Sequence, residues 1–405
     1  RAQARDRGWR PLQPCMIRTR VAHWKHFGIF GGVRSRTPRA GTYSNIVCKD
    51  TVRERLLMDM SDVQDLHVDK QSRIARIVPT SWFLGLLACS LLIVIAMMGW
   101  AGLGMDLLKM SNGKYFLLLA LLATGRYLLQ AHPSGWQRVA RDFCEYAGLF
   151  VFISLLGATA TYPAAAATSG FVDPALARID ALLGFKWMDW YILVANNPWL
   201  QTAGSLAYAN IYMSPVLLLG GLAISGERAR AQLFLFSFWF AALITIFAFL
   251  AFPAVGPLAY VWQGPVPYMP TSALYQAEFI PLLRDNLFFM VDLGTLQGLV
   301  CAPSFHTAAA VIYIAMAWQC RYLRWPLLVI NGAMLLSTPV EGTHYLIDMI
   351  GGAIVGLFAL CTAGAIQYSL PKLRQERIWG ETGIWQNLTS SSSAAVPPAV
   401  QSQDG

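Results

Sequence analysis

The sequence predicts an all-α fold, a polytopic integral membrane bundle of about eight spanning helices. Hydrophobic residues make up 56% of the 405-residue chain and charged residues only 13%, about half the charged share of a typical soluble domain. The mean hydropathy is +0.45, and apolar residues gather in runs close to the length that crosses a bilayer. These observations argue against a soluble globular enzyme and exclude a disordered chain and a secreted disulfide scaffold.

Eight apolar runs predict the spanning helices. In chain order they cover residues 82–102, 115–131, 144–165, 203–224, 231–252, 304–320, 324–340 and 344–367. The first is free of charged residues, and the second carries Arg126, whose long side chain we expect to reach the cytoplasmic face. The fourth follows a tryptophan-bearing segment typical of a membrane interface, and the sixth and seventh are shorter than the roughly 20 residues expected of a span.

The distribution of charge supports this order and predicts an orientation. Residues 1–80 hold 16 Lys and Arg against 7 Asp and Glu, whereas the rest of the chain holds 15 of each. With the basic segment in the cytoplasm, the inside loops contain Arg138, Arg141, Arg228, Arg230, Arg321 and Arg324. The outside loops contain Asp106, Asp173, Asp180, Asp189, Glu278, Asp285, Asp292 and Glu341, offset by only five Lys and Arg. This alternation follows the positive-inside rule and places both termini in the cytoplasm.

The runs and loops divide the chain into four parts. We expect a basic and largely disordered segment over 1–80, two membrane spans over 81–142, a six-span unit over 143–368 and a disordered cytoplasmic tail over 369–405. The basic segment lacks the interleaved aromatic residues that grip nucleic acid, so we expect no nucleic-acid partner. The compact loops and the absence of an evident organellar signal favour a bacterial inner membrane.

His344 and Asp348 are the first candidates for chemistry. They open the eighth predicted span at a spacing of four, which places them on one helical face. An aspartate one turn from a histidine accepts the proton of one ring nitrogen and leaves the other nitrogen basic and oriented. Gly352 and Gly356 continue this face and predict close approach of a neighbouring helix. The alternative is a His–Asp pair that only satisfies two polar groups.

A second candidate is the segment from Ala302 to His306 at the start of the sixth span. Pro303 suits the first position of a helix, and the free N–H groups of a first helical turn bind anions. Ser304 adds a hydroxyl donor there, and His306 adds a proton donor. The alternative is an ordinary helix start that carries an isolated histidine.

Together these elements predict a phosphate site on the outer face of the bundle. One histidine would attack phosphorus, the aspartate would hold it, and the other histidine would protonate the leaving oxygen. No metal-ligand motif and no G-x-x-x-x-G-K phosphate loop is evident in the sequence, so we expect neither a metal nor a cofactor.

These residues carry a resemblance to a known family. Pro303-Ser304-Phe305-His306 resembles the P-S-x-H motif of the type-2 phosphatidic acid phosphatase superfamily, and the segment from Ser337 to Asp348 resembles its third motif, S-R-x5-H-x3-D. The form H-Y-x-x-D at His344, and the segments 179–190 and 252–257, are similar to the inositolphosphorylceramide synthase and sphingomyelin synthase branch. The resemblance covers roughly residues 143–367.

The resemblance implies roles for these residues and a phosphatase-like core of six helices with its site on the extracytoplasmic side. It makes His344 a nucleophile that becomes phosphorylated, Asp348 its partner and His306 the general acid, while Ser304 binds phosphate oxygen. The membrane protein would act on a lipid phosphate.

The sequence departs from the family at the positively charged phosphate ligands. Thr338 stands where the third motif has arginine, and the first motif, K-x6-R-P, has no match. We therefore consider Arg284, the only arginine of its outer loop, and the Thr338 hydroxyl as substrate ligands. Glu341 has no family role, and we expect it to be a solvated loop carboxylate.

Three functions remain open at this stage. The first is a lipid-phosphate phosphatase, in which water resolves the phosphohistidine, and the second is a phosphodiester head-group transferase, in which an alcohol does so. The transferase requires an acceptor pocket, for which the proline-rich loop 262–270 is a candidate. The third is a non-enzymatic transporter or scaffold, which would favour ionisable residues near mid-membrane rather than at span ends.

Overall fold

The structure is a computed structural model that describes residues 80–130, 135–288 and 290–367. Its regular secondary structure over these ranges is helical, apart from one bridge between Gly104 and Met290. The predicted all-α class is therefore confirmed. The predicted basic segment, except for Thr80, and the predicted tail over 369–405 lie outside the described residues.

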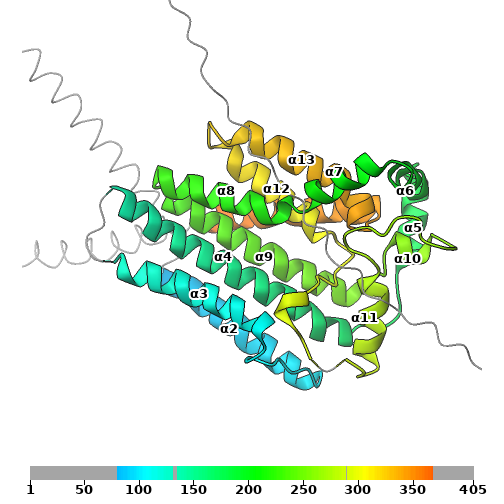
Figure 1. Ribbon diagram of the computed structural model, residues 1–405, viewed down its shortest axis with the longest axis horizontal. Coiled ribbons are helices and arrows are strands. Elements are labelled where there is room, and N and C mark those ends of the chain that lie inside the picture. Colours follow the sequence, from blue (N-terminus) through cyan, green and yellow to red (C-terminus); the bar gives the residue numbers. More distant parts are fainter. Residues whose placement is uncertain (1–79, 131–134, 289, 368–405) are drawn as a thin grey trace, which may run out of the picture. The chain divides into compact units, whose positions relative to one another are not determined.

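The helices follow one another along the chain, with longer connections from α10 to α11 and from α11 to α12 (Figure 1). They are α2 (Thr80–Trp100), α3 (Met110–Leu128), α4 (Gly135–Ala166), α5 (Asp173–Leu182), α6 (Trp187–Ala195), α7 (Pro198–Tyr208), α8 (Asn210–Ser225), α9 (Arg228–Ala251), α10 (Pro257–Tyr260), α11 (Tyr275–Arg284), the 3-10 turn η1 (Leu293–Thr295), α12 (Phe305–Trp318), α13 (Arg324–Glu341) and a C-terminal helix, Leu346–Gln367.

Each of the eight predicted spans overlaps one of these helices or, for 203–224, the pair α7 and α8. In the described part of the chain, four helices are long and apolar enough to cross a membrane, namely α2, α4, α9 and the C-terminal helix. The pair α7 and α8, bent by 42° at its break, would be a fifth, and α12 is a shorter apolar helix. Length and composition thus support an integral membrane bundle, with four or five of the eight predicted spans.

Helix α4 lies at the centre of the packing. It contacts α2, α3, α8, α9 and α11, and Figure 1 shows it running beside α9. The main core joins four fully buried side chains from four different helices, namely Tyr146 of α4, Leu218 of α8, Phe234 of α9 and Tyr313 of α12. Large aromatic side chains bury much apolar area each and therefore dominate the packing energy of such a core. The first two predicted spans pack on this same unit through α4.

An ion-pair network ties three of these helices together. Glu145 of α4 accepts hydrogen bonds from Arg126 of α3 at 2.6 Å and from Arg228 of α9 at 2.8 Å. The Glu145 side chain is only 12% exposed. Arg126 shares this largely buried carboxylate with Arg228, and a charge beside apolar helices is stabilised by a partner of opposite sign. That Arg126 extends toward the cytoplasmic face stays a prediction.

The C-terminal helix approaches α12 closely at two glycines. A Cβ atom at Gly352 would lie 2.1 Å from the backbone oxygen of Ser304, and one at Gly356 would lie 2.7 Å from that of Ala308. Neither position has room for a larger residue, which confirms the close approach predicted from the sequence. The same contact brings the Ser304 N–H to 3.0 Å from the backbone oxygen of Asp348.

The glycine contact leads to a stability prediction. Gly352→Ala forces the two helices apart, and we expect a loss of about 1–3 kcal/mol in the free energy of unfolding. Gly364→Ala is the matched control, because a Cβ there meets nothing within 4 Å. Thermal unfolding of purified protein in detergent measures both. Equal unfolding midpoints for the two variants would contradict the close helix contact.

Candidate active site

A strained turn carries His344. Helix α13 ends at Glu341, and the chain turns before the C-terminal helix begins at Leu346. Within this turn Thr343 has φ +51°, a left-handed conformation that is an outlier for a β-branched residue and costs on the order of 1–3 kcal/mol. The His344 N–H donates to the Pro339 carbonyl at 3.2 Å, and the same carbonyl accepts from the Trp187 indole at 2.7 Å. The backbone of His344 is therefore held by α13 and connected to α6.

The structure brings His344 and Asp348 together, with His344 Nδ1 3.8 Å from Asp348 Oδ2. The prediction that both lie on one helical face is wrong, because His344 precedes the helix that begins at Leu346. Tyr345 occupies the position before the first helical residue, and its N–H donates to Asp348 Oδ2 at 3.1 Å. This is half of a capping box, in which a carboxylate in the first turn accepts the N–H of the capping residue. The C-terminal helix therefore begins at Leu346, two residues later than predicted. The left-handed conformation of Thr343 prevents a helical backbone just before His344.

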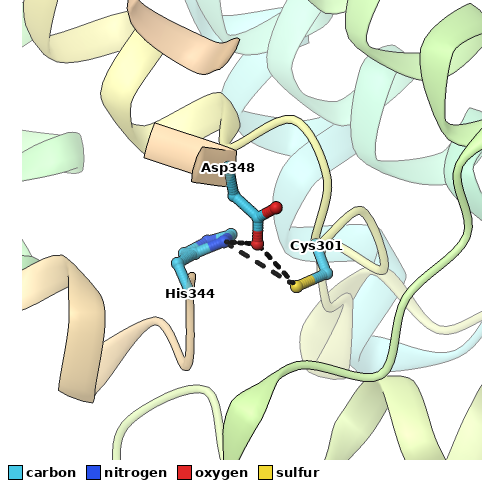
Figure 2. A group of neighbouring side chains, drawn as sticks. All are labelled: Cys301, His344 and Asp348. Atoms are coloured by element: carbon cyan, nitrogen blue, oxygen red, sulfur yellow. Dashed lines mark hydrogen bonds and ion pairs between the residues drawn. The ribbon is translucent and has the colours of Figure 1, made fainter. Parts of the chain in front are cut away.

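Figure 2 shows that the side chains of His344, Asp348 and Cys301 point toward a common centre. His344 Nδ1 is 3.8 Å from Asp348 Oδ2, and the Cys301 thiol donates to the same oxygen at 3.4 Å. All three side chains are buried, with relative exposures of 3% for His344, 2% for Asp348 and 0% for Cys301. Burial and the nearby carboxylates raise the pKa of the Cys301 thiol well above its ordinary value, so this thiol is neutral at physiological pH.

His306 lies in the first turn of α12. Ser304 is the N-cap of that helix, and its hydroxyl oxygen accepts from the Thr307 N–H at 3.4 Å. The prediction that Pro303 occupies the first helical position is wrong by two residues, because the hydroxyl of Ser304 caps the helix and Pro303 precedes the cap. Ser304 is fully buried at this helix start.

Tyr208, the last residue of α7, connects the two histidines. Its ring stacks on the His306 ring with centroids 4.1 Å apart and an interplanar angle of 15°, and its hydroxyl is 3.1 Å from His306 Nδ1. A Cβ at Gly342 would lie 3.0 Å from the Tyr208 ring and 2.7 Å from the His344 ring. The rings of His306, Tyr208 and His344 are thus neighbours at one end of the bundle. No motif surrounds Tyr208, so sequence reasoning missed it.

Two buried aspartates of α5 bind the residues that follow His344 in the chain. Asp173 accepts from the N–H groups of Val255 and Gly256 at 3.0 and 2.9 Å and from the Tyr345 hydroxyl at 3.1 Å. Burial raises the pKa of the Asp173 carboxyl, and these hydrogen bonds oppose that shift. The aspartate was predicted only as part of the acidic outer loops, and the structure makes it a support of the turn.

Asp180 supports the start of the C-terminal helix. Its carboxylate accepts the N–H groups of Leu346 and Ile347 at 2.8 and 2.9 Å. An anion at a helix N-terminus satisfies unpaired N–H groups and interacts favourably with the helix dipole. The segments 179–190 and 252–257, which carry the branch resemblance in the sequence, therefore both contribute residues that flank the His344 turn.

The expectation that Glu341 is a solvated loop carboxylate is wrong. Its relative exposure is 1%, and its carboxylate accepts from the Tyr268 hydroxyl at 2.6 Å and from the N–H and hydroxyl of Thr271 at 3.0 and 2.6 Å. Three donors from the loop between α10 and α11 replace water around this carboxylate. The interaction fastens that loop to the end of α13, three residues before His344.

Two predicted substrate ligands have other contacts. Arg284 donates to the Thr168 hydroxyl and the Gly170 carbonyl, and its guanidinium lies 4.4 Å from the Phe171 ring centroid. The Thr338 hydroxyl donates to the Met334 carbonyl of its own helix at 2.7 Å. Within the described residues, neither side chain has a hydrogen bond or ion pair with the two histidines or with Asp348.

The residues of this histidine–aspartate site lie in a part of the chain that is similar to a known family. Residues 174–362 match the family model described as the PAP2 superfamily, and the matched segment contains His306, His344 and Asp348. The match covers 189 of the 405 residues and makes this part of the chain similar to the type-2 phosphatidic acid phosphatase superfamily. Comparisons with curated proteins and with solved structures found no match.

The contacts of Asp180 lead to a second prediction. Asp180→Ala leaves two N–H groups beside the site without their acceptor, and each unpaired buried N–H costs about 1–3 kcal/mol. We expect a lower midpoint of thermal unfolding. Asp189→Ala, at an exposed aspartate on α6, is the control and should leave the midpoint unchanged. An Asp180→Ala protein with the midpoint of the wild type would show that this carboxylate does not support the turn.

Proposed function

We propose that the protein is a membrane lipid-phosphate phosphatase that acts through a phosphohistidine at His344. The observation that carries the proposal is the gathering of His344, Asp348 and His306 around Tyr208 and Gly342 at one end of a membrane helix bundle. The family match supports the same reaction class. We place the site on the extracytoplasmic face of a bacterial inner membrane, with both termini in the cytoplasm.

His344 is the proposed nucleophile. Its Nδ1 lies on the side of the ring that faces Asp348 and Cys301. In the proposed step Nδ1 carries the proton, and the lone pair of Nε2 attacks phosphorus. The bond between phosphorus and the lipid oxygen breaks as the bond to Nε2 forms. The Asp348 carboxylate stabilises the positive charge that develops on the ring.

His306 is the proposed general acid. In its protonated form, Nδ1–H donates to the Tyr208 hydroxyl and Nε2–H is available to the leaving lipid oxygen. Once that proton has left, the neutral Nε2 accepts a proton from the water that attacks the phosphohistidine. Inorganic phosphate leaves, and both histidines return to their starting states.

The phosphate oxygens need donors in place of the missing family cations. The first-turn N–H groups of α12 and the Ser304 hydroxyl at its cap form one side of the proposed phosphate site. Arg284 and Thr338 remain predicted ligands. Each would have to exchange its present contact, with Thr168 or with Met334 respectively, for a phosphate oxygen.

A second candidate is the head-group transferase of the inositolphosphorylceramide synthase type. The observation that favours it is the position of segments 179–190 and 252–257, whose residues flank the His344 turn. The loop that would hold an acceptor alcohol is fastened to Glu341, close to His344. Hydrolysis and transfer share the phosphohistidine step and differ in the group that resolves it. A non-enzymatic transporter or scaffold is the remaining alternative.

A screen of lipid phosphates tests the proposal. Purified protein should release phosphate from at least one lipid phosphate, and His344→Ala should lower the rate by about three orders of magnitude or more. Gly364→Ala serves as a variant in which the site is intact. Adding diacylglycerol or ceramide separates the two reactions, because a transferase forms a lipid product only when an acceptor is present. A His344→Ala protein that keeps its activity would exclude this mechanism.

Tyr208 leads to a further prediction. Tyr208→Phe keeps the ring stack on His306 and removes the hydroxyl that accepts from Nδ1. We expect kcat to fall roughly tenfold, a part of what a general acid contributes, with little change in KM. The alkaline limb of the pH–rate profile should move to lower pH, because protonated His306 loses an acceptor.

Tyr212→Phe is the matched control for this experiment, because the Tyr212 ring on α8 is exposed. It should leave both kcat and the pH–rate profile unchanged. A Tyr208→Phe protein with the pH–rate profile of the wild type would rule out a positioning role for the Tyr208 hydroxyl.

A further inference from the structure

Three metal-binding atoms lie close together beside His344. Cys301 Sγ is 3.9 Å from His344 Nδ1 and 3.4 Å from Asp348 Oδ2, and Nδ1 is 3.8 Å from Oδ2 (Figure 2). A tetrahedral Zn²⁺, with bonds of about 2.3 Å to sulfur and about 2.0–2.1 Å to nitrogen and oxygen, holds its ligands about 3.3–3.6 Å apart. The three atoms therefore already have nearly the separations of three corners of a zinc tetrahedron.

The direct contacts among these three groups are poor hydrogen bonds. A good N–H···O bond is about 2.7–3.2 Å long, so the separation of 3.8 Å between His344 and Asp348 is too large. The other carboxylate oxygen, Asp348 Oδ1, is buried and has no hydrogen-bond partner. In the described part of the chain, no lysine or arginine forms an ion pair with Asp348. A buried carboxylate with an unused oxygen and no full positive charge beside it is the environment that a bound cation stabilises.

We infer that Cys301, His344 and Asp348 form a binding site for Zn²⁺ or a similarly thiophilic divalent cation, and that an ion bound there inhibits the enzyme. The sulfur ligand selects Zn²⁺ over Mg²⁺ and Ca²⁺, which prefer oxygen ligands. Three protein ligands leave a fourth position for water. The thiol loses its proton to solvent as the zinc–sulfur bond forms, and no oxidation or reduction takes place.

Inhibition follows from the ring nitrogen that the ion uses, and this half of the inference rests on the proposed function. The ion binds the lone pair of His344 Nδ1, so the ring proton must reside on Nε2. Nε2 then has no lone pair with which to attack phosphorus. The ion also occupies Asp348, the carboxylate that would stabilise a charged ring. Removing the ion with a chelator restores both groups.

A binding measurement tests the site without any substrate. Chelator-treated full-length protein in detergent is titrated with Zn²⁺, and bound metal is counted by mass spectrometry after desalting. Co²⁺ is the spectroscopic probe, because it reports thiolate coordination as a charge-transfer band and tetrahedral geometry as visible d–d bands. The Cys301→Ser protein should bind one zinc ion fewer per chain, or bind zinc at least tenfold more weakly. It should also lack the charge-transfer band of the cobalt complex.

Cys320→Ser is the matched control, since Cys320 is a half-buried thiol just after α12, outside the cluster. It should bind zinc and cobalt as the wild type does. Asp348→Asn is a second test variant that keeps the side-chain shape and should also weaken binding, in case Cys301→Ser does not fold. Wild-type protein without a tetrahedral thiolate–cobalt spectrum, or a folded Cys301→Ser protein with unchanged affinity, would overturn the site.

An activity measurement tests the inhibition separately. The rate of phosphate release with Zn²⁺ is compared with the zinc-free rate of the same variant, so that any change in basal rate cancels. The zinc concentration for half-inhibition should rise at least tenfold in Cys301→Ser and stay unchanged in Cys320→Ser. Zinc that binds at Cys301 but leaves the rate unchanged, or raises it, would overturn the inhibition and keep the site. If no lipid phosphate is hydrolysed, the proposed function fails while the binding result still stands.

Discussion

The candidate site depends on hydrogen bonds from backbone N–H groups to buried carboxylates. Asp173 and Asp180 lie on one short helix, α5, and their acceptor oxygens hold the loop at Gly256 and the first turn of the C-terminal helix. Asp348 takes part in the same way, as the acceptor of the Tyr345 N–H. In an apolar bundle an unpaired N–H or carboxylate is costly, so these contacts strongly favour one arrangement of the turn. The residues that follow His344 are thus held by carboxylates, and its own N–H is held by the Pro339 carbonyl.

The second requirement is that two chain segments meet closely. The glycines at 352 and 356 allow the C-terminal helix to touch the backbone of α12, which brings the helix start that carries Ser304 and His306 against the helix that carries Asp348. Tyr208 then completes the arrangement from a third helix, by stacking on His306. Each histidine is thus positioned by a different set of contacts. Tyr208, which stacks on His306, and the ring of His344 both lie close to Gly342, where a side chain would have no room.

Much of this was predictable from the sequence, for identifiable reasons. The apolar runs marked the helices because backbone groups in a bilayer must pair within the segment. The residues of the two histidine motifs were found because each motif lies within a few positions of chain. Tyr208, Cys301 and Asp173 were missed because their partners lie 98, 43 and 172 residues away in the sequence. Glu341 was wrongly placed in solvent for the same reason, since its donors come from a loop 70 residues earlier.

The Pro339 carbonyl links this site to the surroundings of the protein. It accepts from both the His344 backbone and the indole of Trp187, which begins the short helix α6. The neighbouring Trp190 is exposed on that helix, as tryptophans are where a protein meets lipid head groups. One carbonyl oxygen therefore serves two donors, one from α6 and one from the backbone of His344. A displacement of Trp187 would change the acceptor on which the position of this histidine depends.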